Sequence, residues 1–582
     1  MRAGMSTAAR IVSIAVLGMV VGVLTSLAAI GFVELVFALN DWLLIAPRSR
    51  FMVDDTRLLL LATVCVPALG GLVVGVLHRF IPERRSHGPP DVIRAVQGFN
   101  GRIPARSGFL SALASVVSLG AGASVGQYGP LAHLGATLGS LVARISRDTR
   151  WMATVGVGCG VAAAISTAFN APIAGIVFAH EVILRHYSLR AFAPITVAAT
   201  MGYVVANVVF ERPPLFRVEA ISVSFAPEVV GFILIGAAGA FVAVLYMRAI
   251  LFSNRIAGKL PVADYLKPML AGAVLGLAAI WLPDILGIGK ETLRFAVIDH
   301  AFAPGELALL LVAKILATAL CIGFGFAGGV FSPALLIGIL FGALAGNGAE
   351  MVLGDLRSDV AIYAICGMVA VTSAVIGAPL TTILIVFELT RNYDLATAAM
   401  VSVVFSNLVS YRIFGRSLFD VQLRMRGFDL SGGRDKAMLD HRLIESCVTR
   451  DYTALAPEMP LDEAKSRLLA ARRHEGYVID AGGVYLGTVK LEELVACVDG
   501  DHSESGATVA RLARREALIF TASTSVWAAM EQMGDFVGES IPVLEDEDED
   551  GGRMLGVVFE ATIVKAYLDT VNDTRREENA GA

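Results

Sequence analysis

Long apolar segments alternate with short polar ones over the first three quarters of the chain. The first segment follows Arg2 and Arg10 and has no small-residue cleavage site, so we interpret it as a first helix with a cytoplasmic N-terminus rather than a signal peptide. Shorter, broken pieces lie between the long ones, and we expect about ten or more helical segments because helices satisfy their own backbone groups in lipid. Segments long enough to cross a hydrocarbon core of about 30 Å lie near residues 8–38, 57–80, 228–252, 306–350 and 393–414.

The pattern changes after about Phe428, where hydropathy falls sharply. Residues 429–442 are rich in glycine and charge and predict a linker between two domains. Beyond it, residues 476–498 and 540–568 share one order of features: a β-branched strand, an acidic or glycine turn, a second strand ending in Leu-Gly-x-Val, and a helix. We therefore expect a paired α/β domain over 443–575 and a disordered tail over 576–582.

Composition agrees with a membrane domain followed by a soluble one. The chain has 582 residues, 55% of them hydrophobic and 17% charged, with a mean hydropathy of +0.68, which is typical of a polytopic membrane protein. The net charge is −5, and the short acidic run 545–550 indicates a solvated loop. The six cysteines contain no C-x-x-C pair, so we expect reduced core cysteines and no metal. We also expect no nucleic-acid partner.

The apolar region contains an internal repeat. Residues 169–181 ("FNAPIAGIVFAHE") align with 376–388 ("IGAPLTTILIVFE") at an offset of 207, which matches Ala-Pro with Ala-Pro and Glu181 with Glu388. Two similar offsets predict two repeats, at roughly 8–210 and 228–420, and paired Gly/Pro-interrupted segments indicate a binding site near the bilayer midplane. The second alignment, at an offset of 203, matches Pro130, Gly135 and Gly139 with Pro333, Gly338 and Gly342.

Each interrupted segment places a glycine-rich turn before a proline and a helical run, which predicts a helix that starts inside the membrane. The first N–H groups of such a helix are unpaired and carry the positive end of its dipole, so the breaks predict an anion site. A third candidate break is 86–91 ("SHGPPD"). The two aligned breaks contain no lysine or arginine, and binding through partial charges suits an ion that must also leave. We assign the anion role to Gly126, Gly129, Gly328 and Gly329, and helix packing to Gly135 and Gly139.

Several motifs in order resemble the CLC family of chloride channels and chloride/proton exchangers. They are "GFGFAGGVFSPALLIG" (323–338), "FNAPIAG" (169–175), "GAPLTTILIVFELTRNY" (377–393) and Gly-x-x-Gly-Pro at 126–130. The tail resembles the family's pair of CBS modules. The resemblance implies a polytopic all-α membrane domain over 1–428 with two inverted-topology repeats and broken helices, followed by an α/β CBS pair. It also implies a homodimer with one pore per subunit, which transports a small inorganic anion. The dimer is expected in the cell membrane, with both termini cytoplasmic.

Carried over by the resemblance, the family's anion-facing loops show substitutions in this chain. His87 stands where the anion-coordinating serine is usual, Tyr128 stands in the place of the gating glutamate, and Phe419 replaces the pore tyrosine. Val182 stands where exchangers carry the inner proton-handling glutamate. The implied anion-binding or pore residues are His87, Gly88, Gln127, Tyr128, Gly129, Val330, Phe331 and Phe419.

These substitutions bear on mechanism, because coupling an anion to a proton requires a titratable group in the anion path. Tyrosine, with an ordinary pKa of about 10, stays neutral at usual pH. We therefore predict a passive, proton-uncoupled anion channel or uniporter for chloride, bicarbonate, nitrate or fluoride. Two alternatives stay open for Tyr128, which is either a swinging gate or a fixed ring. Two also stay open for His87, which either binds the anion or points away from it.

Other functions remain as alternatives. A proton-coupled anion exchanger would use His87, His180 or Glu181 as its proton carrier. An intramembrane hydrolase would use Ser124 of "GASVG" (122–126), although that motif requires a preceding strand.

Four further polar residues receive structural roles. We expect Glu181 and Glu388 each to have a partner near a helix end, and Lys314 to snorkel or pair. His133 and His180 are expected to be core histidines.

The C-terminal pair raises the question of a cofactor, because CBS pairs often bind adenine nucleotides. Only Glu493 matches the expected ribose partner, so we favour a structural or dimer-stabilising tail without a required cofactor.

Overall fold

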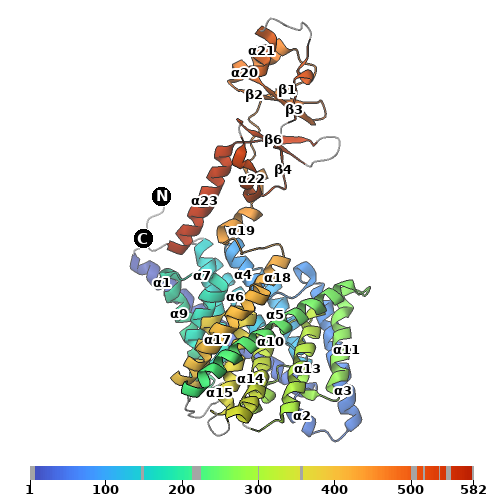
Figure 1. Cartoon of the computed structure of the whole chain (residues 1–582), viewed down its shortest axis with the longest axis vertical. Coiled ribbons are helices and arrows are strands. Elements are labelled where there is room, and N and C mark those ends of the chain that lie inside the picture. The colour runs from blue at the N-terminus through green and yellow to red at the C-terminus, as the bar shows by residue number, and fades with distance from the viewer. Residues whose placement is uncertain are drawn as a thin grey trace. The chain divides into compact units, whose positions relative to one another are not determined.

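In a computed structural model of the chain, the described residues form two compact units that divide between Phe428 and Asp429 (Figure 1). The structure describes residues 7–145, 150–212, 225–298, 300–353, 358–499, 507–515, 518–536, 538–545 and 552–579.

The first unit is helical, and its helices fall into two successive sets, the first ending near residue 204 and the second beginning near residue 225. The first set is α1 (Thr7–Trp42), α2 (Pro47–Phe51), α3 (Thr56–His78), α4 (Pro89–Gly98), α5 (Ala105–Gly120), α6 (Tyr128–Ile145), α7 (Arg150–Phe169), α8 (Pro172–Phe178) and α9 (Leu189–Val204). The second set is α10 (Phe225–Lys259), α11 (Lys267–Ala279), α12 (Lys290–Phe295), α13 (Pro304–Gly323), α14 (Phe331–Leu353), α15 (Val360–Ile376), α16 (Pro379–Thr390), α17 (Tyr393–Phe414) and α18 (Leu418–Met425).

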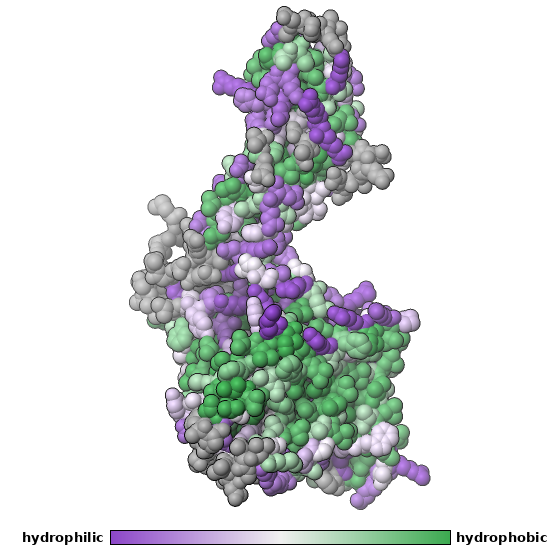
Figure 2. Space-filling model, in the orientation of Figure 1, coloured by the Kyte–Doolittle hydropathy of each residue, from purple (hydrophilic) through white to green (hydrophobic). Residues whose placement is uncertain are grey.

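Within the described residues, eight helices are long and apolar enough to cross a membrane, and four shorter apolar helices lie among them. The sequence prediction of a many-helix membrane domain with broken segments is confirmed, and a broad hydrophobic belt covers the visible face of this unit (Figure 2). The predicted segment 306–350 is interrupted, because α13 ends at Gly323 and α14 begins at Phe331.

The most buried helices lie at equivalent places in the two sets. Every residue of α15 is buried, as expected for a helix that is apolar on all sides. It packs against α14 as α7 packs against α6, and glycines permit both contacts. A Cβ added at Gly139 would lie 1.9 Å from the Gly156 carbonyl oxygen, and one at Gly342 would lie 2.2 Å from the Tyr363 carbonyl oxygen. The packing role predicted for Gly139 is confirmed.

The second unit contains two copies of one α/β arrangement. In each three-stranded sheet the first strand is parallel to the middle one and the last is antiparallel to it, with a register shift between the middle and last strands. The repeated order of strand, turn, strand and helix that the sequence predicts is confirmed. The elements are β1 (Ala454–Leu455), α20 (Leu461–Ala471), β2 (Glu475–Ile479), β3 (Tyr485–Lys490) and α21 (Leu491–Asp499), then β4 (Phe520–Thr521), α22 (Val526–Gln532), β5 (Ile541–Leu544), β6 (Met554–Val558) and α23 (Glu560–Asn579).

Two boundary predictions differ from the structure. The predicted linker 429–442 contains helix α19 (Arg434–His441), whose Leu439 is fully buried in the core of the second unit. The predicted disordered tail 576–582 begins too early, because α23 continues to Asn579, and the last three residues lie outside the described part. Charge misled both predictions, since arginine and glutamate are also strong helix formers.

Candidate functional site: an anion pathway at three broken helices

Two glycines from the two repeats bind each other directly. The N–H of Gly126 donates to the carbonyl of Gly329 at 2.7 Å, and the N–H of Gly329 donates to the carbonyl of Gly126 at 2.7 Å. The two residues are 203 positions apart, the offset at which the repeats align. A reciprocal contact between equivalent residues is what a twofold relation between inverted repeats requires.

The three predicted breaks converge on this pair. A Cβ added at Gly129 would lie 3.1 Å from the Cα of Gly329 and 3.4 Å from the Cδ of Pro89, the first residue of α4. The start of α6 therefore contacts both the start of α4 and the segment that leads into α14. Glycine is required here because a side chain would displace the neighbouring backbone.

Free backbone N–H groups lie at this convergence. Among the described residues, the N–H groups of Tyr128, Gly129 and Phe331 donate to no protein acceptor, as expected for the first turn of a helix. The N–H of Gln127 differs, because it donates to the Ser332 hydroxyl at 3.2 Å. The N–H of Gln127, which the resemblance implies as a pore residue, is therefore already bonded within the protein.

Tyr128 is enclosed by aromatic rings and is 2% exposed. Its ring centroid lies 4.0 Å from that of Phe169 and 5.4 Å from that of Phe331, and Phe331 also lies 6.2 Å from Phe178. The four rings come from the starts of α6 and α14 and the ends of α7 and α8. No carboxylate belongs to this aromatic cluster, so an uncharged ring lies where the starts of α6 and α14 meet.

Glu181 and Glu388 cap helices of the opposite repeat. The Glu181 carboxylate accepts from the N–H groups of Leu380 and Thr381, both at 2.9 Å, at the start of α16. The Glu388 carboxylate accepts from the N–H groups of Ile173 at 3.0 Å and Ala174 at 2.7 Å, at the start of α8. Each carboxylate meets the positive end of a helix dipole, which confirms the structural role predicted for both residues.

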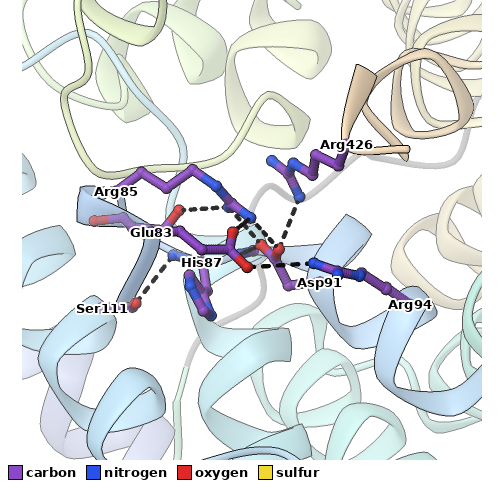
Figure 3. A network of polar contacts seen from close by, with 9 residues as sticks. Glu83, Arg85, His87, Asp91, Arg94, Ser111 and Arg426 are labelled. Carbon is purple, nitrogen blue, oxygen red and sulfur yellow. Dashed lines mark hydrogen bonds and ion pairs between the residues drawn. The ribbon is translucent and has the colours of Figure 1, made fainter. Parts of the chain in front are cut away.

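A polar network holds the third break (Figure 3). Asp91, with a side chain 9% exposed, accepts from the N–H of Gly88 at 2.8 Å and so caps α4. It also accepts from Arg85 at 2.7 Å and from Arg426, which follows α18, at 2.9 Å. Burial disfavours the charged carboxylate, but the hydrogen bond from Arg85 and the charges of Arg426 and Arg85 hold the pKa of Asp91 well below its usual range.

Glu83 extends the network to Arg85 and to Arg94, the latter at 3.2 Å. The ligand atoms of Glu83, His87 and Asp91 lie within 4.8 Å of one another, a spacing that suits a metal ion. The guanidinium of Arg85 pairs with both carboxylates and supplies the positive charge between them. We interpret the cluster as a salt-bridge network.

His87 lies beside this network without joining its ion pairs. Its backbone N–H donates to the Ser111 hydroxyl at 3.0 Å, and its ring meets the ring of the buried His133 edge-on at 5.8 Å. Its Nε2 atom is buried and has no partner in the described part of the chain. Burial lowers the pKa of His87, so the imidazole is neutral near pH 7.

The comparisons with known proteins bear on this geometry. The family model described as voltage gated chloride channel matches residues 69–411, more than half of the chain. The chain belongs to this family. A CBS domain model matches residues 509–569.

The most similar family members include proteins with two different names. An H(+)/Cl(−) exchange transporter ClcA of Vibrio cholerae is 28% identical over 416 residues, which cover 68% of this chain and 87% of that protein. A voltage-gated ClC-type chloride channel ClcB of Escherichia coli is 26% identical over 411 residues, covering 69% and 96%. The crystal structure of a slow cyanobacterial Cl−/H+ antiporter has a TM-score of 0.64 at 24% identity, covering 71% of this chain and 97% of that chain.

Two further residues that the resemblance implies for the pore, Val182 and Phe419, are also buried. Val182 is buried in the short π-helical segment η2 (Ala179–Leu184), next to the capping residue Glu181. Phe419 is buried at the start of α18, which packs against α4 and α15.

The remaining predicted residues have local partners. Ser124 follows α5 rather than a strand, and its hydroxyl lies 3.1 Å from that of Thr318, so the arrangement that the hydrolase alternative requires is missing from this described segment. Lys314 does not snorkel, because its Nζ is buried and donates to two carbonyls. His180 is fully buried and bonds the His186 carbonyl through Nδ1. In the second unit, Glu493 pairs with Arg514 at 3.6 Å.

Sequence reasoning missed Asp91 and Arg426. The spacing of an acidic residue three positions after Gly88 was a capping signal that could have identified Asp91. Arg426 is 335 residues away from Asp91 and gave no signal.

Proposed function

We propose that this member of the voltage-gated chloride channel family is a passive, proton-uncoupled anion channel or uniporter. The observation that carries the proposal is the buried aromatic surrounding of Tyr128, with no carboxylate at residue 128 or residue 182. A tyrosine hydroxyl does not titrate near neutral pH, and valine cannot carry a proton. Chloride is the expected anion of this family, and bicarbonate, nitrate and fluoride are the alternatives to be tested.

The free N–H groups of Tyr128, Gly129 and Phe331 supply the anion site in this proposal. They carry partial positive charge at two helix starts, while glycines keep the backbone open to close approach. Partial charges bind an anion without holding it as firmly as a lysine or arginine in direct contact.

Proton measurements on liposomes test the proposal. The purified chain is reconstituted with an outward chloride gradient, and chloride efflux is measured with a potassium ionophore present. With the ionophore still present, so that potassium carries the compensating charge, a pH dye reports proton movement. We expect chloride efflux and a proton signal equal to that of protein-free liposomes. Proton uptake that is proportional to chloride movement would instead establish an exchanger.

A proton-coupled exchanger is the second candidate, and the relative named H(+)/Cl(−) exchange transporter favours it. Its proton would need a carrier other than the two lost glutamates. Glu181 is poorly suited, because two backbone N–H groups and the Thr381 hydroxyl already donate to its carboxylate at the start of α16.

We further propose that His87 influences which anion passes. Its unpaired, buried Nε2 atom beside the first residues of α4 supports this role. Flux of chloride, bicarbonate, nitrate and fluoride is compared between wild type and His87→Ser. A changed order of rates supports the role, and an identical order contradicts it.

We propose a homodimer with one pore per subunit, in the cell membrane, with both termini cytoplasmic. Membership of the family supports this assembly. Counting of bleaching steps on singly labelled chains in liposomes should give two steps per particle, and a single step would contradict the dimer.

A further inference from the structure

Lys314 is a buried cation inside the membrane domain. It lies in α13, its side chain is 1% exposed, and its Nζ donates to the carbonyls of Ile285 at 3.1 Å and Gly287 at 2.8 Å. Within the described residues it forms no ion pair, and the carboxylate of Asp284 acts on it electrostatically. A lysine at such a position normally reaches the interface or an acidic partner, so its burial between carbonyls calls for an explanation.

Two separate routes link Lys314 to the segment 122–126. The N–H of Gly287, whose carbonyl accepts from Lys314, donates to the carbonyl of Gly122 at 2.8 Å. One turn along α13, on the same face as Lys314, the Thr318 hydroxyl lies 3.1 Å from that of Ser124. The ammonium is therefore held beside the loop that ends at the Gly126–Gly329 pair.

We propose that the Lys314 ammonium is an electrostatic determinant of anion entry, which attracts a small inorganic anion to the broken helices without touching it. The inference rests on the proposed anion transport. The breaks that precede α6 and α14 contain only partial charges, and those act over a short range, within the first turn of a helix. A full charge in a water-poor interior acts over a longer range and is weakly screened. A charge in this place raises the local concentration of the anion.

Other charges near Lys314 are arranged so that they do not cancel it. Asp284 is exposed and its carboxylate accepts from the Thr292 hydroxyl at 2.9 Å. Lys290 is also positive and lies over the Phe37 ring at 4.2 Å. We therefore expect Lys314 to contribute a positive field at segment 122–126.

Lys314→Gln removes the positive charge but keeps a hydrogen-bond donor for the two carbonyls, because a glutamine amide still donates hydrogen bonds. Chloride flux into liposomes is measured against chloride concentration, at low ionic strength and with added gluconate salt. We expect Lys314→Gln to raise the half-saturating chloride concentration about three- to tenfold at low ionic strength. The difference should shrink with added salt, because salt screens the field that reaches the anion on its approach. Lys314→Arg keeps the charge and should stay within about twofold of the wild type.

Lys267→Gln is the matched control, because Lys267 pairs with Asp264 at 2.6 Å at the start of α11. It should leave the half-saturating concentration unchanged. A folded Lys314→Gln protein with the wild-type concentration dependence at both ionic strengths would overturn the inference while leaving anion transport intact. Absence of any anion flux in the wild type would overturn the proposed function and the inference with it.

Asp284→Asn provides a second test that does not disturb α13. The asparagine oxygen still accepts from Thr292, while the negative charge near Lys314 is removed. We expect a half-saturating chloride concentration about twofold lower than in the wild type at low ionic strength. If Lys314→Gln fails to fold, an unchanged concentration dependence in Asp284→Asn overturns the inference.

Discussion

In the proposed mechanism, Tyr128 is the residue that accounts for the lack of proton coupling. Its ring is held by Phe169 and Phe331 at the meeting point of two broken helices, next to the free N–H groups that suit an anion. A carboxylate in this place would compete with the anion and release it on protonation. An aromatic ring contributes bulk and a hydroxyl, so proton concentration has no direct control over the site.

Replacing Tyr128 by glutamate should introduce that control. We expect chloride flux through Tyr128→Glu to rise about fivefold or more from pH 8 to pH 5, because protonation removes the competing charge. Flux through the wild type and through Tyr128→Phe should change less than about twofold over the same range. The measurement is initial chloride efflux from liposomes at each pH. A flat profile for Tyr128→Glu would contradict the position of residue 128 on the pathway.

His87 predicts a pH dependence of stability. Burial lowers the pKa of His87 in the folded protein, whereas the unfolded chain takes up a proton at the ordinary value of about 6.5. Below that pH the unfolded state binds more protons, so stability falls as pH decreases from 7 to 5.

His87→Gln should remove this contribution. Its melting temperature should fall by about 2 °C less than that of the wild type between pH 7 and pH 5. Thermal unfolding followed by intrinsic fluorescence in detergent measures it. An equal loss in both proteins would show that His87 does not contribute.

At the scale of elements, reciprocal contacts between the two repeats join their helices. The Gly126–Gly329 pair joins the starts of α6 and α14, and the two capping glutamates join α8 to α16. In each case the partners are related by the repeat. The first N–H groups of α6 and α14 include free ones, whereas those of α8 and α16 donate to carboxylates. This difference separates helix starts that are open to an anion from helix starts that are structural.

Removing either capping carboxylate should destabilise the membrane domain. Glu388→Ala leaves the N–H groups of Ile173 and Ala174 without a charged acceptor, and we expect a loss of about 1–3 kcal/mol. Glu181→Ala should behave alike. Glu306→Ala, at an exposed position, should change stability by less than about 0.5 kcal/mol. Denaturant titration of the purified chain measures these values, and an unchanged Glu388→Ala protein would contradict the capping role.

The repeats and the breaks were accessible from the sequence because they leave local marks. Glycine, proline and the fixed offset predicted which segments start inside the membrane, and Glu181 and Glu388 aligned without a structure. Contacts between distant segments left no such mark. The Asp91–Arg426 ion pair and the link from Lys314 through Gly287 to Gly122 depend on tertiary packing, and charge concealed the helical character of α19.

At the scale of the whole molecule, two units with separate cores carry different chemistry. The membrane unit presents backbone dipoles and a buried cation, whereas the second unit presents paired sheets with Glu493 in a long contact to Arg514. A carboxylate that already has a cationic partner offers less to a ribose hydroxyl. This favours a structural role for the CBS pair.

Adenine nucleotides should therefore leave the full chain unchanged. We expect the melting temperature with millimolar ATP or AMP to stay within about 1 °C of the value without nucleotide. A ligand whose dissociation constant is far above its concentration adds almost no stability to the folded state. Differential scanning fluorimetry measures it. A concentration-dependent rise that disappears in Glu493→Gln would contradict a purely structural pair.

The reversal potential in a planar bilayer tests uncoupled transport most directly. The chain is placed between solutions that differ in chloride concentration, first at equal pH and then with one pH unit across the membrane. Passive flow of the anion alone predicts a reversal potential at the chloride Nernst value that does not move when the pH gradient is applied. A reversal potential displaced from that value, and shifted further by the pH gradient, would contradict the account and establish proton coupling.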